Sequence, residues 1–170
     1  IIKTGLEAMP SVAGRFEVLD TGNRPFTIIL DYAHTPDSLE NTLLTVREFA
    51  RTRIITVFGC GGDRDKGKRP IMGEIAGKLS SYVVITSDNP RTEDPMKIIE
   101  EIEAGIKKTD CEYVCIENRR EAIRYAIHNA QPDDIIVLAG KGHETYQEIN
   151  GVKYPFDEKV VVAELLLADE

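Results

Sequence analysis

The sequence contains no cysteine pair of the kind that forms a disulfide framework or a zinc site. Its three cysteines, Cys60, Cys111 and Cys115, are odd in number and include no CxxC spacing. Such a set is typical of reduced thiols in a cytosolic protein. Because Cys111 and Cys115 share strand parity, we expect the thiols to pack in the core. The three histidines lie far apart, so the sequence predicts no metal site.

Long apolar runs and an excess of positive charge are also lacking. No run approaches the roughly 20 residues that a helix needs to cross a bilayer, so no membrane insertion is expected. The start, Ile1 to Gly5, has none of the regions of a signal peptide, and because it lacks Met we expect a fragment of a longer protein. The net charge of -8 and the scattered Lys and Arg residues argue against nucleic-acid binding.

Short apolar runs alternate with longer amphipathic stretches over the 170 residues, a length that suits one domain. This alternation predicts an α/β fold with a mostly parallel sheet flanked by helices. The predicted strands are 26–30, 54–58, 82–86, 113–116 and 135–139. The predicted helices are 38–50, 71–79, 95–107, 119–129 and 157–167. Each predicted strand is nearly continuous in apolar residues, which indicates burial on both faces.

Two turns complete the expected topology. Asn150-Gly151 stands between short strand-like segments and predicts a type I′ hairpin, which we expect to append antiparallel strands to the sheet. The segment before Phe26, with Pro10 and Gly14, is interpreted as a linker followed by a short strand pair around Gly22-Asn23.

Polar, glycine-rich segments follow most of the predicted strands. In an open parallel sheet, ligands bind outside the carboxyl ends of the strands, so these segments predict the binding site. They would gather arginines, carboxylates, an amide and bare glycine backbone at one edge of the sheet. The segments are 31–37, 59–70, 87–91 and 140–144.

The second segment contains a near match to a phosphate-binding P-loop at residues 62–69. A P-loop needs Ser or Thr after the Gly-Lys pair to hold Mg²⁺, and Arg69 cannot do so. Asp63 and Asp65 would also repel phosphate. A self-contained ATPase is therefore disfavoured.

Arginines and carboxylates supply the candidate ligand contacts. Arg64 and Arg91 each present a planar fork that fits a carboxylate, although each could instead pair with Asp65 or Glu93. Pro90 restricts Asn89 to extended geometry and so fixes how this loop is presented.

The last segment offers further candidates. Glu144 could receive an ammonium group, beside the flexible backbone of Gly140. Lys141 and His143 are possible phosphate contacts, although His143 could equally be a loop histidine bonded to backbone.

Four motifs occur in order: DYAHTPDSLE, FGCGGDRDKGKRP, DNPR and GKGHE. Together they resemble the C-terminal domain of the Mur ligase family. The resemblance covers nearly the whole chain and implies a Rossmann-like domain that binds the incoming amino acid. It implies that residues 1–14 are a linker from a missing central ATPase domain and that residues 15–170 form the amino-acid-binding domain.

The resemblance also implies an activity and its partners. In this family ATP activates the carboxylate of UDP-MurNAc-L-Ala-D-Glu as an acyl phosphate, and the amine of the added amino acid attacks it. ATP and Mg²⁺ would be bound mainly by the central domain, which this domain would contact. The setting would be peptidoglycan synthesis in the bacterial cytoplasm.

Individual positions are carried over by motif. No catalytic residue is expected within this chain. The DNPR form resembles ligases that add meso-diaminopimelate, whereas lysine-adding relatives usually replace Arg91. The resemblance assigns nucleotide contacts to Arg15 and Asp31. It assigns the amino-acid site to Arg64, Asp88, Asn89, Pro90, Arg91, Gly140 and Glu144.

Alternatives remain open at this point. The chain could belong to a lysine-adding Mur ligase, or to a folylpolyglutamate-synthase-like enzyme. It could instead be a free-standing module that binds a zwitterionic amino acid or a nucleotide without catalysis.

Overall fold

A mostly parallel sheet forms the centre of the computed structural model, which describes residues 12–168. Its strands are β1 (Glu17–Leu19), β2 (Thr27–Asp31), β3 (Ile54–Phe58), β4 (Tyr82–Ile85), β5 (Glu112–Cys115) and β6 (Ile135–Ala139). They lie in the order β1-β2-β6-β3-β4-β5, and within this sheet only β1 runs antiparallel to its neighbour. The predicted α/β class is confirmed, as is the early strand pair, which is β1 with β2.

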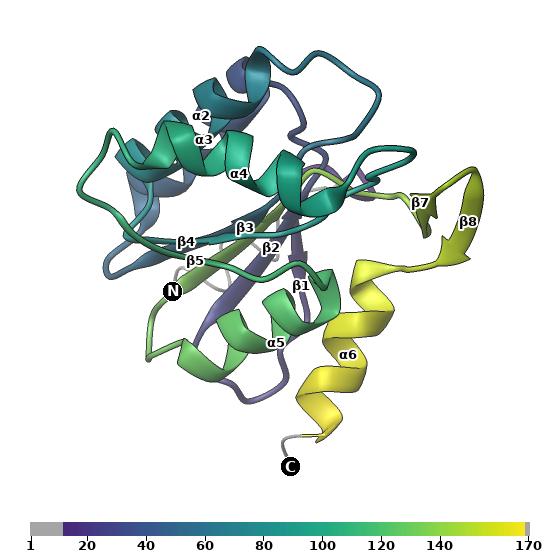
Figure 1. The fold of residues 1–170 in the computed structure, drawn as a ribbon. Coiled ribbons are helices and arrows are strands. Elements are labelled where there is room, and N and C mark those ends of the chain that lie inside the picture. Colours follow the sequence, from purple (N-terminus) through teal and green to yellow (C-terminus); the bar gives the residue numbers. More distant parts are fainter. Residues whose placement is uncertain (1–11, 169–170) are drawn as a thin grey trace.

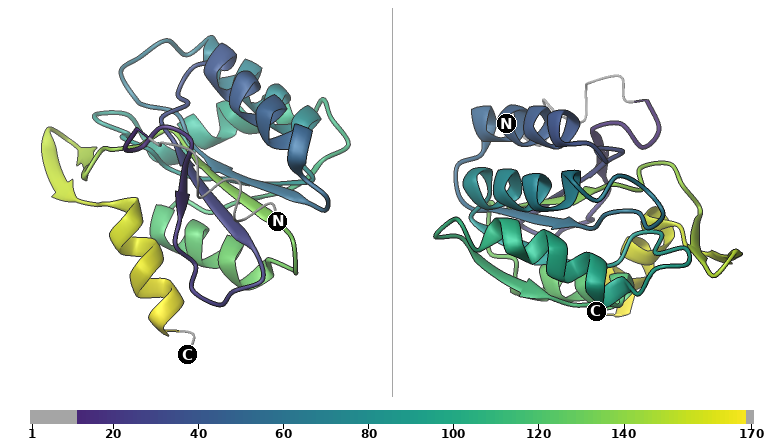
Figure 2. Two further views of the ribbon diagram at one scale, coloured as in Figure 1. Left: turned by 180° about the vertical axis from the view of Figure 1, so that it is seen from behind. Right: turned by 45° about the horizontal axis from the view of Figure 1, so that its top comes forward.

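Helices cover both faces of the sheet (Figures 1 and 2). One face carries α2 (Pro36–Phe49), α3 (Lys68–Leu79) and α4 (Pro95–Ile106); the other carries α5 (Arg119–Asn129) and α6 (Glu158–Ala168). Successive residues of a strand therefore enter different cores. In β6, Val137 packs with the first group of helices, whereas Ile136 and Leu138 pack with the second. Burial on both faces explains the continuous apolar runs.

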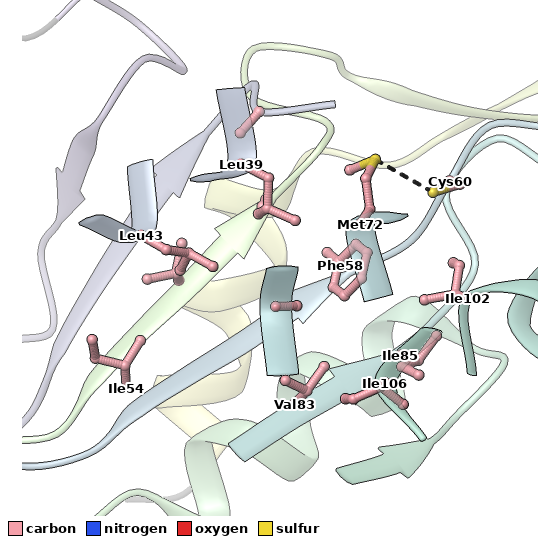
Figure 3. Close-up of a cluster of buried hydrophobic side chains, with 14 of the residues drawn as sticks. Leu39, Leu43, Ile54, Phe58, Cys60, Met72, Val83, Ile85, Ile102 and Ile106 are labelled. Carbon is pink, nitrogen blue, oxygen red and sulfur yellow. Dashed lines mark hydrogen bonds between the residues drawn. The ribbon is translucent and has the colours of Figure 1, made fainter. Parts of the chain in front are cut away.

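The core between the sheet and α2–α4 contains the first cysteine (Figure 3). Cys60 Sγ lies 3.8 Å from Met72 Sδ, and burial raises the pKa of this thiol to about 12. Cys111 and Cys115 are half-buried and pack against the same cluster. All three cysteines are free thiols, and their predicted core role is confirmed.

Helix caps fix where the polar loops end. The Thr35 hydroxyl accepts a hydrogen bond from the Ser38 amide, and the Ser38 hydroxyl accepts one from the Thr35 amide, so α2 begins with a capping box. Asp94 caps α4 through the Met96 amide, with Pro95 at the first helical position. The loops that follow β2 and β4 are therefore anchored at both ends.

The hairpin consists of β7 (Tyr146–Ile149) and β8 (Val152–Pro155). Asn150 and Gly151 both have positive φ, 49° and 76°, which confirms the predicted type I′ turn. The expectation that the hairpin extends the main sheet is wrong, since it forms a separate two-stranded sheet. The hairpin lies at the carboxyl ends of the parallel strands, where Ile149 of β7 forms an isolated parallel β-bridge with Arg91.

The predicted linker falls mainly on residues 1–11, which lie outside the described residues, and the division at residue 14 stays a prediction. Within residues 12–168, no helix combines the length and the apolar character needed to cross a membrane.

Candidate functional site

A cleft of about 700 Å³ opens at the carboxyl ends of β2, β3, β4 and β6. This volume is in the range of small-molecule binding sites. The loops after the four strands each contribute to its wall, as the strand-end argument predicted. The predicted residues that line it are Arg64, Asp88, Asn89, Arg91, Gly140 and Glu144.

Two glycines allow charged side chains to approach the backbone. An ideal Cβ on Gly61 would lie 2.9 Å from Arg91 Nη1 and 3.8 Å from Arg64 Cγ, so both arginines lie against this glycine. An ideal Cβ on Gly140, which has φ of +117°, would lie 2.8 Å from Asp88 Oδ2. Side chains at these two positions would fill the cleft where its charged groups lie.

The arginines occupy one side of the cleft. Arg91 Nη1 donates to the Gly62 carbonyl at 2.9 Å, and its Nε lies 3.3 Å from Glu148 Oε2. Arg64 is exposed, and its Nη1 donates to the neighbouring backbone carbonyl. Within residues 12–168, neither arginine forms an ion pair with Asp65 or Glu93, the partners considered from sequence.

The carboxylates are held from below by a buried lysine. Lys141 is fully buried, and its Nζ donates to Asn89 Oδ1 at 3.0 Å and to Glu144 Oε2 at 3.3 Å, and lies 3.9 Å from Asp88 Oδ1. Asn89 Nδ2 also donates to Glu144 Oε2, at 3.0 Å. The suggestion that Lys141 contacts phosphate is wrong, because its ammonium points into this network. The buried side chains of Asn89 and Lys141 thus hold the Glu144 carboxylate in place through hydrogen bonds to its Oε2 atom.

A second buried ion pair supports the strand ends. Arg119 Nε donates to Glu158 Oε1 at 2.7 Å, and both side chains are fully buried. The same guanidinium donates to the carbonyls of Ser87 and Ala139, which directly precede the Asp88 and Gly140 positions. Sequence reasoning missed this pair, because 39 residues separate its members and neither stands in a loop motif.

The loop that resembles a P-loop is fastened by other interactions. Arg69, at the position where a P-loop needs a hydroxyl, is fully buried and pairs with Glu93 and Glu101. Arg69 and the amide of Asp63 together lower the pKa of Glu93 to about 2, with Arg69 as the largest cause. The Lys68 ammonium donates to a backbone carbonyl. Arg69 and Lys68 are thus bonded to protein groups and are not placed to bind the phosphates of a nucleoside triphosphate.

No set of three His, Cys, Asp or Glu side chains within the described part of the chain is placed to hold a metal ion.

The predicted nucleotide contacts lie beside the cleft. Arg15 is exposed, and its guanidinium carbon lies 5.1 Å from the centre of the Tyr32 ring. Tyr32 also contacts the rings of His34 and His143, at 4.5 and 5.2 Å. Burial, together with the charges of Glu144 and Asp88, raises the pKa of Tyr32. Sequence reasoning named no role for this tyrosine, although it stands in the first polar segment.

Asp31 is buried beneath the first loop. Its carboxylate accepts hydrogen bonds from the amides of Phe16 and Ala33, at 2.7 and 2.9 Å, and from the Thr42 hydroxyl. Its assignment as a ribose contact stays a prediction. Pro90 is also buried, and its carbonyl packs closely against Gly62 behind the cleft lining.

Residues 14–142 match the family described as Mur ligase, glutamate ligase domain. Together with the α/β fold and the strand-end cleft, this match shows that the chain belongs to the Mur ligase family.

Among curated relatives is a UDP-N-acetylmuramoyl-L-alanyl-D-glutamate–2,6-diaminopimelate ligase from Caldanaerobacter subterraneus subsp. tengcongensis. It is 58% identical over 160 residues, which cover 94% of this chain and 33% of the relative. A ligase of the same name from Alkaliphilus oremlandii is 58% identical over 96% of this chain and 34% of its own. The chain spans about a third of the length of these relatives.

A solved structure of a ligase with that name is similar to this chain with a TM-score of 0.87 and 44% identity, over 95% of this chain and 33% of that one. The UDP-N-acetylmuramate-alanine ligase of Thermotoga maritima has a TM-score of 0.63 at 19% identity, over 94% of this chain and 30% of its own. The second likeness concerns the fold alone.

Proposed function

We propose that this chain is the amino-acid-binding domain of an ATP-dependent ligase. The ligase adds meso-diaminopimelate to UDP-MurNAc-L-Ala-D-Glu during peptidoglycan synthesis in the bacterial cytoplasm. The names of the similar ligases support the reaction. The share of those ligases that the chain covers supports its assignment as one domain of the enzyme.

The observation that carries this proposal is the separation of charge across the cleft. Arg64 and Arg91 lie against Gly61 on one side, and Asp88 and Glu144 lie beside Gly140 and Lys141 on the other. Diaminopimelate carries a carboxylate and an ammonium group at each end. A cleft with two cations opposite two anions complements such a ligand.

Each side chain then has a defined task. Arg91 binds the distal carboxylate of diaminopimelate. Arg64 lies beside Arg91 and offers a second cation to a ligand carboxylate. Glu144, fixed by Lys141 and Asn89 through Oε2, presents Oε1 to a ligand ammonium. The backbone of Gly140 leaves room for the ligand next to Asp88.

The nucleotide would bind outside the cleft, mainly to the central domain. ATP, when bound with Mg²⁺, supplies the phosphoryl group that activates the dipeptide carboxylate, and the residues for this lie mainly in the central domain. Arg15 is exposed beside Tyr32 and would meet a phosphate when that domain closes, with Asp31 as the second nucleotide contact. This chain binds and orients the attacking amino acid.

Amide NMR spectra of the chain, titrated with meso-diaminopimelate or lysine, test the proposal. We expect diaminopimelate to shift the signals of residues 59–64, 88–91 and 140–144, and lysine to cause smaller shifts in the arginine-bearing loops. Equal saturable shifts with both ligands would favour a lysine-adding ligase. Saturable shifts with ATP and none with either amino acid would favour a nucleotide-binding module.

A further inference from the structure

Strand β7 lies along the Asp88–Arg91 loop and bonds to it at successive residues. Gln147 Nε2 donates to the Asp88 carbonyl at 2.6 Å. The Glu148 amide donates to Asn89 Oδ1 at 2.9 Å. The hairpin is therefore a second support for this loop, next to the buried lysine.

The same strand holds the backbone of Arg91. The Arg91 amide donates to the Glu148 carbonyl at 3.0 Å, and the Asn150 amide donates to the Arg91 carbonyl at 2.8 Å. Arg91 has φ of +51°, a left-handed conformation that is unfavourable for a long side chain. The two bonds offset that cost, and they determine the direction in which the side chain leaves the backbone.

The guanidinium is fixed at two of its three nitrogens. Glu148 Oε2 lies 3.3 Å from Nε, and the Gly62 carbonyl accepts from Nη1 at 2.9 Å. Within residues 12–168, Nη2 donates no hydrogen bond, and Arg91 lines the cleft. A side chain held in this way loses less conformational freedom when it binds a ligand. The edge formed by Nη1 and Nη2 is the one left for a carboxylate.

We propose that Glu148 is a positioning residue, which holds the Arg91 guanidinium in the orientation that selects a ligand carboxylate. This inference rests on the proposed function. Glu148 binds Nε and its negative charge repels a ligand carboxylate from that edge. The ligand carboxylate is thereby directed to the opposite edge, and the β7–β8 hairpin becomes an element that determines specificity.

The experiment uses the full-length ligase that contains this chain, with the variants Glu148→Gln and Glu148→Ala. We expect the KM for diaminopimelate to rise about two- to fivefold in Glu148→Ala, the size expected for one partly exposed ion pair. Glu148→Gln keeps a polar group of the same size beside Nε but removes the charge, and should give an intermediate KM. The kcat, the KM for ATP and the poor kcat/KM for lysine should stay close to the wild-type values.

Lys153→Gln is the matched control. Lys153 lies opposite Glu148 in the register of the hairpin but forms no ion pair with it among the described residues, and its ammonium lies over the Tyr146 ring at 4.2 Å, so the variant changes one charge in the same hairpin. We expect no change in the KM for diaminopimelate. Thermal unfolding of all variants separates a loss of fold from a loss of positioning.

The outcomes are distinguishable. A wild-type ligase that does not add diaminopimelate would overturn the proposed function and this inference with it. A wild-type ligase that adds it, with an unchanged KM in Glu148→Ala, would overturn the inference alone. A lower KM would show that Glu148 competes with the ligand, and parallel losses for lysine would show a merely structural role; either result also overturns the inference.

Discussion

Charged side chains of the cleft are positioned by neighbouring groups within the protein. Glu144 depends on Lys141 and Asn89, and Arg91 depends on Gly62 and Glu148. Each thus has groups left to bind a ligand while its orientation is already set. Preorganisation of this kind makes single substitutions informative, because a lost contact is not replaced by rearrangement.

Substitution of Arg91 by Ala should reduce selectivity for diaminopimelate. Its distal carboxylate would lose its cation, and since Arg91 is 19% exposed we expect a loss near the lower end for desolvated pairs, about 2 kcal/mol. This corresponds to roughly 30-fold in kcat/KM. Lysine has no distal carboxylate, so its turnover should not fall. Kinetics of the full-length ligase with both amino acids measure the ratio, and equal losses for both would make Arg91 a structural residue.

Glu144→Gln should raise the KM for diaminopimelate and leave the KM values for ATP and the UDP-linked dipeptide nearly unchanged. A bond between an ammonium and a carboxylate contributes about 1.5 to 3 kcal/mol, so the rise should be roughly tenfold or more. Glu121→Gln, on the exposed face of α5, is the control and should behave like the wild type. Comparable damage to the KM for ATP would assign Glu144 to the nucleotide instead.

At the scale of elements, Glu93 joins two strand-end loops. Its carboxylate pairs with Arg69 at the start of α3, lies 3.4 Å from Lys66 Nζ, and accepts a hydrogen bond from the Asp63 amide. The loop before α3 is thereby tied to the loop before α4. Both arginines of the cleft lie on this joined pair of loops.

Glu93→Gln should destabilise the protein in a pH-dependent way. The pKa of Glu93 is lowered from 4.5 to about 2 in the folded chain, so its charge stabilises the fold above pH 4.5, and this contribution is lost as the pH falls through 2. The difference in unfolding temperature between wild type and variant should therefore be large near neutral pH and shrink in acid. Thermal unfolding at several pH values measures it.

Glu74→Gln supplies the comparison on α3. Glu74 also has a lowered pKa, chiefly because of Lys78, but the pair lies on the surface and should contribute little. A difference for Glu93→Gln that stays constant with pH would contradict the assigned charge effect.

The elements themselves could be predicted from sequence, whereas their docking could not. Apolar runs identified the parallel strands. Burial on both faces leaves a continuous signal in β3 and β6, whereas β5, at the edge of the sheet, is only partly buried. Asn150-Gly151 identified the hairpin because both residues must adopt positive φ. The position of the hairpin depends on the backbone of Arg91, which has a positive φ. Because Arg91 is not a glycine, nothing in the sequence indicates this left-handed conformation. For the same reason the predicted extension of the main sheet was wrong.

The position of the site was predictable where its residues stand in the loops after the strands, as with Arg64, Arg91 and Glu144. Lys141 was misread and Arg119 was missed, because burial of a long charged side chain depends on acceptors that the fold brings from distant segments.

At the scale of the whole molecule, the proposed function makes the chain a binding domain, with the residues for phosphoryl transfer mainly in another domain. We expect it to show no ATP hydrolysis and no ligation when supplied with ATP, Mg²⁺, diaminopimelate and the UDP-linked dipeptide. The reason is that Arg69 stands where a P-loop needs a hydroxyl to hold Mg²⁺, and its guanidinium is already paired with Glu93 and Glu101. A phosphate-release assay checks this, with the full-length ligase as the positive control. Steady phosphate release by the chain alone would contradict it.

The contact between Gly14 and the Gly140–Glu144 loop has a mechanical consequence. An ideal Cβ on Gly14 would lie 2.2 Å from the His143 nitrogen, and one on Gly142 would lie 2.7 Å from the Gly14 oxygen. Main chain thus touches main chain, with no compressible side chain between them. A displacement of the chain at Gly14 would therefore press directly on the backbone of the loop that carries Glu144.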